Sequence, residues 1–253
     1  MKIAFACGGT GGHIFPALSV AEEVRKNFPG TEIIYVAGKK DVESAIFRGL
    51  SGEKIVPIES APYRGVRSLY DPSFLLKLGR GFMQARHFLS KERPDLVVGF
   101  GGYASFPAVF TAKVFFNIPT MIHEQNVVPG LANKWLARLT HATAVSFEAT
   151  KTFLPKRRNV RVTGNPIRAA IERDCREEAL KFFGFDADKI TLLVLGGSQG
   201  AESINLFLPG ALALLDPALR KRLQVLHLCG KMSPEEAVSA CATEEVPARG
   251  YSF

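Results

Sequence analysis

Residues 2–13 read KIAFACGGTGGH, an apolar run that ends in a turn with four glycines and a histidine. A helix-like pattern follows from Ile14, so the segment predicts a buried strand that enters a helix through a tight glycine turn. Glycines let the backbone approach a ligand closely, and the exposed N–H groups at a helix N-terminus attract an anion. His13 lies at the mouth of this turn and can exchange a proton near neutral pH. We therefore expect the turn to bind a phosphorylated ligand.

The composition is that of an ordinary globular protein. Its 253 residues are 47% hydrophobic and 22% charged, and this length is sufficient for two domains. The four cysteines indicate neither a zinc site nor a disulfide framework, which favours a reducing cytoplasm. No apolar run has the length of a membrane span, and no signal peptide is evident.

The charge is distributed unevenly along the chain. The net charge is +8 at pH 7, and the excess of basic residues lies within residues 1–165. This asymmetry predicts an anionic partner for the first part of the chain, with nucleic acid and an acidic membrane surface as candidates. A generally basic surface without a dedicated partner is the alternative.

Short apolar runs alternate with helix-length segments along most of the chain. The strand-like runs cover residues 3–6, 32–36, 54–58, 95–100, 119–123, 142–146, 159–163, 191–195 and 224–228, with a further one at 249–253. This alternation predicts an α/β fold in which helices cover both faces of parallel sheets. Ligands of such sheets bind at the carboxyl ends of the strands.

The order of apolar strand, glycine-rich turn and helix occurs at two places in the sequence. Residues 192–200 repeat the opening order of an apolar strand, a glycine-rich turn and a helix. Pro166 disfavours helix at Asn165 and marks a turn, so we predict a first domain of residues 1–165 and a second of residues 166–253. The second is shorter than a doubly wound domain usually is, so we expect it to be incomplete.

Further glycine-rich or polar turns follow other predicted strands. Residues 99–105, GFGGYAS, match the dinucleotide pattern G-x-G-x-x-A, with Glu124 downstream as a candidate ribose ligand. The alternatives are a dinucleotide-dependent oxidoreductase and a second ligand-facing turn with Tyr103 and Ser105 as donors. Residues 123–126, HEQN, end the next strand, and residues 196–200, GGSQG, form a second candidate phosphate cradle. Turns at adjacent strand ends predict one shared site.

Residues 73–91 predict a helix with more apolar side chains than one core face needs. The core-face spacing is met by Leu75, Leu78, Phe82, Ala85 and Leu89. Off this face lie Phe74, Leu76, Met83 and Phe88, interleaved with basic residues. Such a mixture is typical of contact with an anionic membrane, for which the candidates are Leu76, Lys77, Arg80, Met83 and Arg86. A helix buried on two sides is the alternative.

Five motifs together resemble a known family. They lie at residues 8–13, 101–105, 123–126, 164–168 and 196–200, in the order found in the MurG family of bacterial N-acetylglucosaminyltransferases. The resemblance covers the whole chain and implies a GT-B fold, in which two Rossmann-like domains face a cleft. It implies an inverting transfer of N-acetylglucosamine from UDP-N-acetylglucosamine to the C4 hydroxyl of lipid I, undecaprenyl-pyrophosphoryl-N-acetylmuramyl-pentapeptide. The product, lipid II, serves peptidoglycan synthesis and thereby cell shape and division.

The resemblance also implies roles for single residues. The first domain is expected to bind lipid I and the membrane, and the second to bind the UDP-sugar. His13 matches a histidine proposed to act as, or near, the general base. The donor-contact positions match Thr10, Gly11, Gly12, Asn126, Arg168 and Ser198. The acceptor-side candidates are Gly102, Tyr103, Ser105 and Glu124.

Partners and location follow from the same resemblance. No cofactor, metal or nucleic acid is expected. The implied location is the cytoplasmic face of the inner membrane, with peripheral binding to anionic lipid and with other cell-wall synthesis proteins as candidate partners. Family members continue past the position that matches Phe253, so we expect the donor pocket to be only partly encoded. The alternative interpretation is a truncated, catalytically weak or inactive fragment that binds a membrane or a partner, or one chain of a split enzyme.

Overall fold

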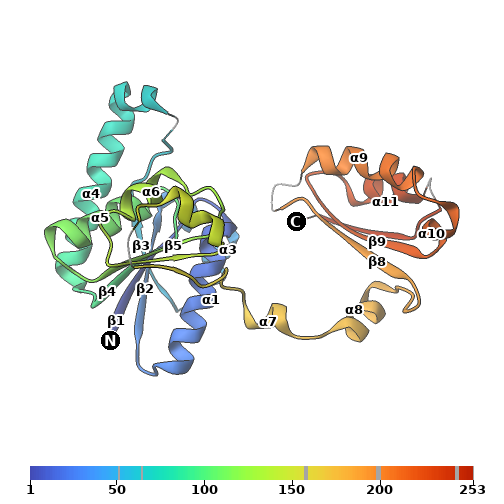
Figure 1. Cartoon of the computed structure of the whole chain (residues 1–253), viewed down its shortest axis with the longest axis horizontal. Coiled ribbons are helices and arrows are strands. Elements are labelled where there is room, and N and C mark those ends of the chain that lie inside the picture. The colour runs from blue at the N-terminus through green and yellow to red at the C-terminus, as the bar shows by residue number, and fades with distance from the viewer. Residues whose placement is uncertain (51, 64, 157–158, 198–200, 243–244, 253) are drawn as a thin grey trace. The chain divides into compact units, whose positions relative to one another are not determined.

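The chain folds into two compact units, Met1–Glu172 and Arg173–Phe253 (Figure 1). The computed structural model describes residues 1–253 except 51, 64, 157–158, 198–200, 243–244 and 253. The predicted boundary at 165/166 lies before this division. The residues just after it still belong to the first unit, because the guanidinium of Arg168 lies over the ring of Phe15.

A parallel sheet of seven strands forms the centre of the first unit, in the order β3-β2-β1-β4-β5-β6-β7. The strands are β1 (Lys2–Ala6), β2 (Glu32–Gly38), β3 (Lys54–Ile58), β4 (Leu96–Gly99), β5 (Thr120–Glu124), β6 (Ala142–Val145) and β7 (Val160–Val162). Every strand predicted for this part of the sequence is present. The apolar runs of the five inner strands are buried on both faces, which is the pattern that parallel sheets require, whereas the edge strands β3 and β7 are partly exposed.

Helices cover the sheet on both faces. Ala4 and Ala6 of β1 pack in the core shared with α4, α5 and α6, whereas Ile3 and Phe5 pack in the core shared with α1 and α3. The helices are α1 (Gly11–Asn27), α2 (Lys39–Val42), α3 (Ala45–Arg48), α4 (Pro72–Glu92), α5 (Ser105–Phe115), α6 (Leu131–Leu136) and α7 (Ala169–Glu172). Two 3₁₀ helices, η1 (Val66–Tyr70) and η2 (Glu148–Phe153), complete the unit. The alternation along β1 thus separates two cores.

The strand order fixes the place of a ligand site. β1 lies between β2 and β4. From β1 the chain continues to β2 and β3 on one side of it, and then crosses to β4 on the other side. Connections that diverge in this way leave a crevice at the carboxyl ends of the two central strands. The glycine turns at residues 8–13 and 99–105 follow β1 and β4, and therefore meet at this crevice.

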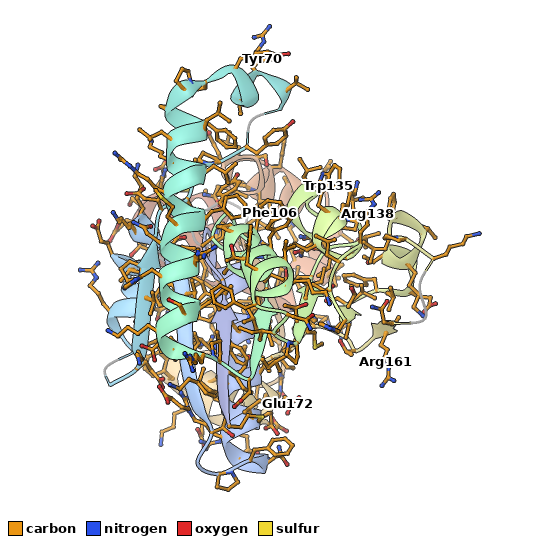
Figure 2. All side chains as sticks on the ribbon, turned by 90° about the vertical axis from the view of Figure 1, so that its left-hand side faces the viewer. Tyr70, Phe106, Trp135, Arg138, Arg161 and Glu172 are labelled. Atoms are coloured by element: carbon orange, nitrogen blue, oxygen red, sulfur yellow. The ribbon has the colours of Figure 1, made fainter. Side chains whose placement is uncertain are left out.

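The prediction of a core face on α4 is wrong in part. Phe74 and Phe88, predicted to lie off that face, are buried, and Leu75 is 48% exposed. The helix packs closely at Gly81, which is buried, because a Cβ there would lie 2.5 Å from the Glu59 carbonyl oxygen. The first turns of α4 project from the unit, with Tyr70 at the tip (Figure 2).

The second unit has a parallel sheet of three strands in the order β10-β9-β8. The strands are β8 (Ile190–Leu195), β9 (Leu223–Gly230) and β10 (Ala248–Ser252), and the helices are α8 (Arg176–Phe183), α9 (Glu202–Ala213), α10 (Pro217–Lys221) and α11 (Pro234–Ala242). Val194, Leu212 and Val225 contribute to its core, whereas Leu193 and Leu195 of the edge strand β8 are exposed. Two parallel α/β units confirm the predicted class.

Candidate functional site

The first glycine turn places the N-terminus of α1 at the crevice. Gly8 and Gly9 have φ angles of 159° and 88°, and Gly9 thus lies in the region that favours glycine. Thr10 is the N-cap residue, and its side chain makes no capping hydrogen bond. Since the first N–H groups of a helix lack partners within the helix, α1 presents donors and a positive dipole end at the crevice.

The second glycine turn packs directly against the first. Gly102 has a φ of 81°, and a Cβ there would overlap the Gly8 carbonyl group. Gly101 faces the imidazole of His13, because a Cβ on Gly101 would lie 2.8 Å from His13 Nδ1. Glycine at both positions therefore allows the two turns to share one wall, with Tyr103 half exposed beside them.

Two of the predicted acceptor-side residues are buried in the scaffold. Ser105 is fully buried, and its Oγ lies 2.6 Å from the Ala6 carbonyl oxygen, which joins α5 to β1. Glu124 is 1% exposed, and its two carboxylate oxygens accept four hydrogen bonds from one loop residue and two residues at α6. The donors are Asn126 N, Asn126 Nδ2, Gly130 N and Asn133 Nδ2. Both side chains hold turns of the site in place.

A chain of hydrogen bonds links His13 to the carboxyl end of β5 and to the segment that follows β7. His13 Nδ1 lies 3.1 Å from Gln125 Oε1, and Gln125 Nε2 lies 2.9 Å from the Phe100 carbonyl oxygen and 3.1 Å from His123 Nδ1. His123 Nε2 lies 3.1 Å from the Gly164 carbonyl oxygen. Burial lowers the pKa of His123, which opposes protonation of its ring. We did not predict this role for Gln125, although it stands in the polar run at residues 123–126.

A pocket of about 230 Å³ opens beside the start of α1. Gly11, Gly12 and Phe15 line it from the helix, and Asn165 and Arg168 line it from the segment after β7. The guanidinium carbon of Arg168 lies 4.4 Å from the centre of the Phe15 ring, a cation–π contact that holds the charge near the helix N-terminus. The structure thus brings together three of the predicted donor-contact residues.

The remaining predicted donor contacts lie elsewhere. Thr10 precedes the pocket at the N-cap of α1, and Asn126 is exposed in the loop after β5. Ser198 lies outside the residues that the structure describes, and so does most of the second glycine cradle. In the part that is described, Gly197 has a φ of 74° at the end of β8.

Cys7 lies directly under the first glycine turn but is unsuited to nucleophilic catalysis. It is fully buried, and burial raises the pKa of its thiol to about 12, with a smaller effect from Asp41. The thiol therefore stays protonated at neutral pH. Among the described residues, no group of three or more His, Cys, Asp and Glu side chains has an arrangement that could hold a metal ion.

The candidate membrane residues of α4 form part of an apolar and basic surface. Leu76 and Met83 are more than half exposed, and Lys77, Arg80 and Arg86 are exposed as well. A cavity of about 270 Å³ opens between α4 and α5, lined by Phe82, Met83, Arg86, Phe110, Thr111 and Phe115. We call these five exposed residues of α4, Leu76, Lys77, Arg80, Met83 and Arg86, together with Phe115 the α4 surface. No helix in the described part of the chain is long and apolar enough to cross a membrane.

Comparison with family models identifies both units. Residues 3–145 match the glycosyltransferase family 28 N-terminal domain, and residues 191–253 match the C-terminal domain of the same family. The glycine turns after β1 and β4 and the polar loop after β5 all lie within the first match. This result disfavours the oxidoreductase alternative raised by residues 99–104.

Single relatives agree with this family. A UDP-N-acetylglucosamine–N-acetylmuramyl-(pentapeptide) pyrophosphoryl-undecaprenol N-acetylglucosamine transferase of Halothermothrix orenii is 43% identical over 94% of this chain and 63% of the relative. The transferase of the same name from Thermoanaerobacter sp. is 38% identical over 97% of this chain and 66% of the relative. The chain thus spans a little under two thirds of the length of these curated relatives.

Solved structures agree on the fold. Acinetobacter baumannii MurG superposes with a TM-score of 0.69 and 25% identity, over all of this chain and 68% of that one. A UDP-GlcNAc 2-epimerase from Neisseria meningitidis, bound to UDP-GlcNAc, has a TM-score of 0.64 at 15% identity over all of this chain and 72% of its own, which concerns the fold alone. The resemblance to MurG and the predicted GT-B class are confirmed, and this chain belongs to glycosyltransferase family 28.

Proposed function

We propose that this chain takes part in the transfer of N-acetylglucosamine from UDP-N-acetylglucosamine to the C4 hydroxyl of lipid I, with inversion at the anomeric carbon. The product would be lipid II for peptidoglycan synthesis. The observation that carries the proposal is the meeting of two glycine turns and His13 at the crevice between β1 and β4, in a chain of glycosyltransferase family 28.

The chemistry needs a base and a stabilised leaving group. In this proposal His13 takes the proton from the C4 hydroxyl as the oxygen attacks the anomeric carbon. The bond between that carbon and the β-phosphate oxygen breaks, and UDP leaves with the electron pair. The N-terminus of α1 and the guanidinium of Arg168 stabilise anionic groups in the pocket they share.

Residue roles follow from this arrangement. Donor contacts are assigned to Thr10, Gly11, Gly12, Asn126, Arg168 and Ser198. Gly102 and Tyr103 face the acceptor side, and Ser105 and Glu124 act there through the turns that they hold. Gly102 lets the two glycine turns pack together, because it has no side chain to meet the Gly8 backbone, and the pyrophosphate of the acceptor would bind beside them.

The first test measures sugar transfer. The assay follows N-acetylglucosamine from UDP-N-acetylglucosamine to a soluble lipid I analogue, and His13→Gln is expected to lower the rate by about 10²-fold because the base is lost. His87→Gln is the matched control, since His87 is an exposed histidine on α4 away from the crevice. Product is quantified by mass spectrometry, and UDP binding by calorimetry.

Two results would contradict the proposal in different ways. An unchanged rate in His13→Gln removes His13 as the base. No transfer and no UDP binding by the folded chain instead favours the alternative, in which the chain is a non-catalytic module that binds a membrane or a partner.

We also propose that the α4 surface binds an anionic membrane on its cytoplasmic side, where lipid I would be taken up. Exposed Leu76, Met83 and Phe115 supply apolar groups, and the guanidinium of Arg86 lies 5.9 Å from the Phe115 ring centre. Basic side chains beside exposed apolar groups are the combination that interfacial binding needs. Other cell-wall synthesis proteins remain candidate partners at the same location.

Removal of two charges from this surface tests the membrane proposal. Lys77→Gln combined with Arg80→Gln is expected to weaken binding to phosphatidylglycerol vesicles about 30-fold, since each charge contributes about 1 kcal/mol near an anionic surface. Lys181→Gln combined with Lys221→Gln in the second unit makes the same change in net charge. Vesicle sedimentation measures both, and an equal loss in the two double variants would show binding through net charge alone.

A further inference from the structure

We propose that Gln125 is a positioning residue that holds His13 in one tautomer, with the proton on Nδ1 and a free lone pair on Nε2. The tautomer follows from hydrogen-bond geometry. Its catalytic meaning rests on the proposed function, in which His13 is the base. Three hydrogen bonds connect the Gly164 carbonyl, which can only accept, through His123 and Gln125 to His13.

The first step assigns the tautomer of His123. The Gly164 carbonyl oxygen can only accept a hydrogen bond, so His123 Nε2, 3.1 Å away, carries a proton and donates it. The His123 ring is 3% exposed, and its burial favours the neutral form despite Glu124 next to it in the chain. A neutral ring has one N–H group, and His123 Nδ1 is therefore an acceptor.

The second step orients the amide of Gln125. One end of this amide lies 2.9 Å from the Phe100 carbonyl oxygen and 3.1 Å from His123 Nδ1, and both of these atoms are acceptors. Only the NH₂ group can donate to two acceptors, so it occupies this end. The amide oxygen must then face the other way, toward His13.

The third step assigns His13. Gln125 Oε1 accepts, so His13 Nδ1 at 3.1 Å is the donor and carries the proton. In the neutral ring, Nε2 then holds the lone pair that a base needs, and the Nδ1–H bond to Gln125 persists after Nε2 takes up a proton. Gly101 leaves room for this ring, since a Cβ there would lie 2.9 Å from His13 Cε1.

Nitrogen NMR of the histidine rings tests the tautomer directly. The chain has five histidines, and spectra of His13→Gln and His123→Gln assign the two relevant rings. At about pH 8, above the ordinary histidine pKa, we expect the proton of His13 on Nδ1 and that of His123 on Nε2. Gln125→Met should leave His13 in exchange between both tautomers while His123 keeps its own, because the Gly164 bond remains.

The matched control is Gln84→Met. Gln84 is a partly buried glutamine of α4 whose Oε1 accepts from Glu59 N, so its replacement removes an equivalent bond far along the chain from His13. It should change neither ring. If Gln125→Met unfolds the site, the unmodified chain still tests the inference, because its His13 proton must lie on Nδ1.

The outcomes separate this inference from the proposed function. A proton on His13 Nε2 in the unmodified chain, or a His13 tautomer that Gln125→Met leaves unchanged, overturns the inference whether or not the chain transfers sugar. A fixed Nδ1 tautomer supports it even if His13→Gln leaves transfer unaffected, a result that overturns only the role of His13 as base. Where transfer is measured, Gln125→Met should lower kcat about tenfold with KM for the UDP-sugar unchanged.

Discussion

Gly102→Ala is expected to lower the free energy of unfolding of the first unit by about 2–5 kcal/mol. A residue with a side chain at this left-handed φ of 81° costs about 1–2 kcal/mol, and overpacking costs about 1–3 kcal/mol more. The added methyl group would meet the backbone of Gly8, which cannot rotate away as a side chain can. Urea unfolding followed by fluorescence of Trp135, the single tryptophan, reports on this unit.

Two other glycines separate the causes of this effect. Gly30 has a φ of 82° but open space around its Cβ position, so Gly30→Ala should cost only the conformational part, about 1–2 kcal/mol. Gly79 is a helical residue of α4 with open space, and Gly79→Ala should stabilise by about 0.5–1 kcal/mol. Equal costs at Gly102 and Gly30 would show that the two glycine turns do not pack as described.

Glu124→Gln is expected to destabilise the first unit by about 2–6 kcal/mol, although the two side chains have nearly the same shape. Both carboxylate oxygens accept hydrogen bonds in the native structure. In glutamine an NH₂ group replaces one of these two oxygens. Its N–H groups would then face the two N–H donors that this oxygen accepts from in the native structure. Two partly buried donors, either those of Asn126 or those of Gly130 and Asn133, then lose their acceptor, at about 1–3 kcal/mol each.

The same unfolding experiment measures this change. Glu148→Gln is the matched control, because Glu148 is an exposed residue paired with Lys151 and should cost less than about 1 kcal/mol. The loop after β5 should also rearrange in Glu124→Gln, so the His13 tautomer signal is expected to change together with stability. A cost no greater than that of Glu148→Gln would contradict the role of Glu124 as the organiser of this loop.

Much of the fold could be predicted because its signals are local. Each predicted strand is a short apolar run, and a run buried on both faces needs no knowledge of its neighbours to be recognised. The glycine turn at residues 8–13 likewise identifies a strand, a tight turn and a helix start in one segment. Family resemblance added the order of the motifs and the fold class.

The rotation of α4 and the burial of side chains could not be predicted in this way. Periodicity predicted a core face of α4 that includes Leu75, but in the folded chain Gly81 packs against the Glu59 carbonyl, and Phe74 and Phe88 are buried instead. Ser105 and Glu124 are polar residues beside candidate ligand turns, and their sequence positions suggested contact with a ligand. Their partners, Ala6 for Ser105 and the start of α6 for Glu124, are visible only in the folded chain.

The sequence by itself determined that the chain alternates strands and helices, that glycine turns follow β1 and β4, and that His13 stands at the first of them. These properties depend on backbone preferences and hydrophobic periodicity over a few residues. Only the tertiary structure decided that Gln125 lies between His13 and His123 and that Arg168 lies over Phe15. The physical reason is that hydrogen-bond direction and ring contact depend on atoms brought together from distant segments by the strand order of the sheet.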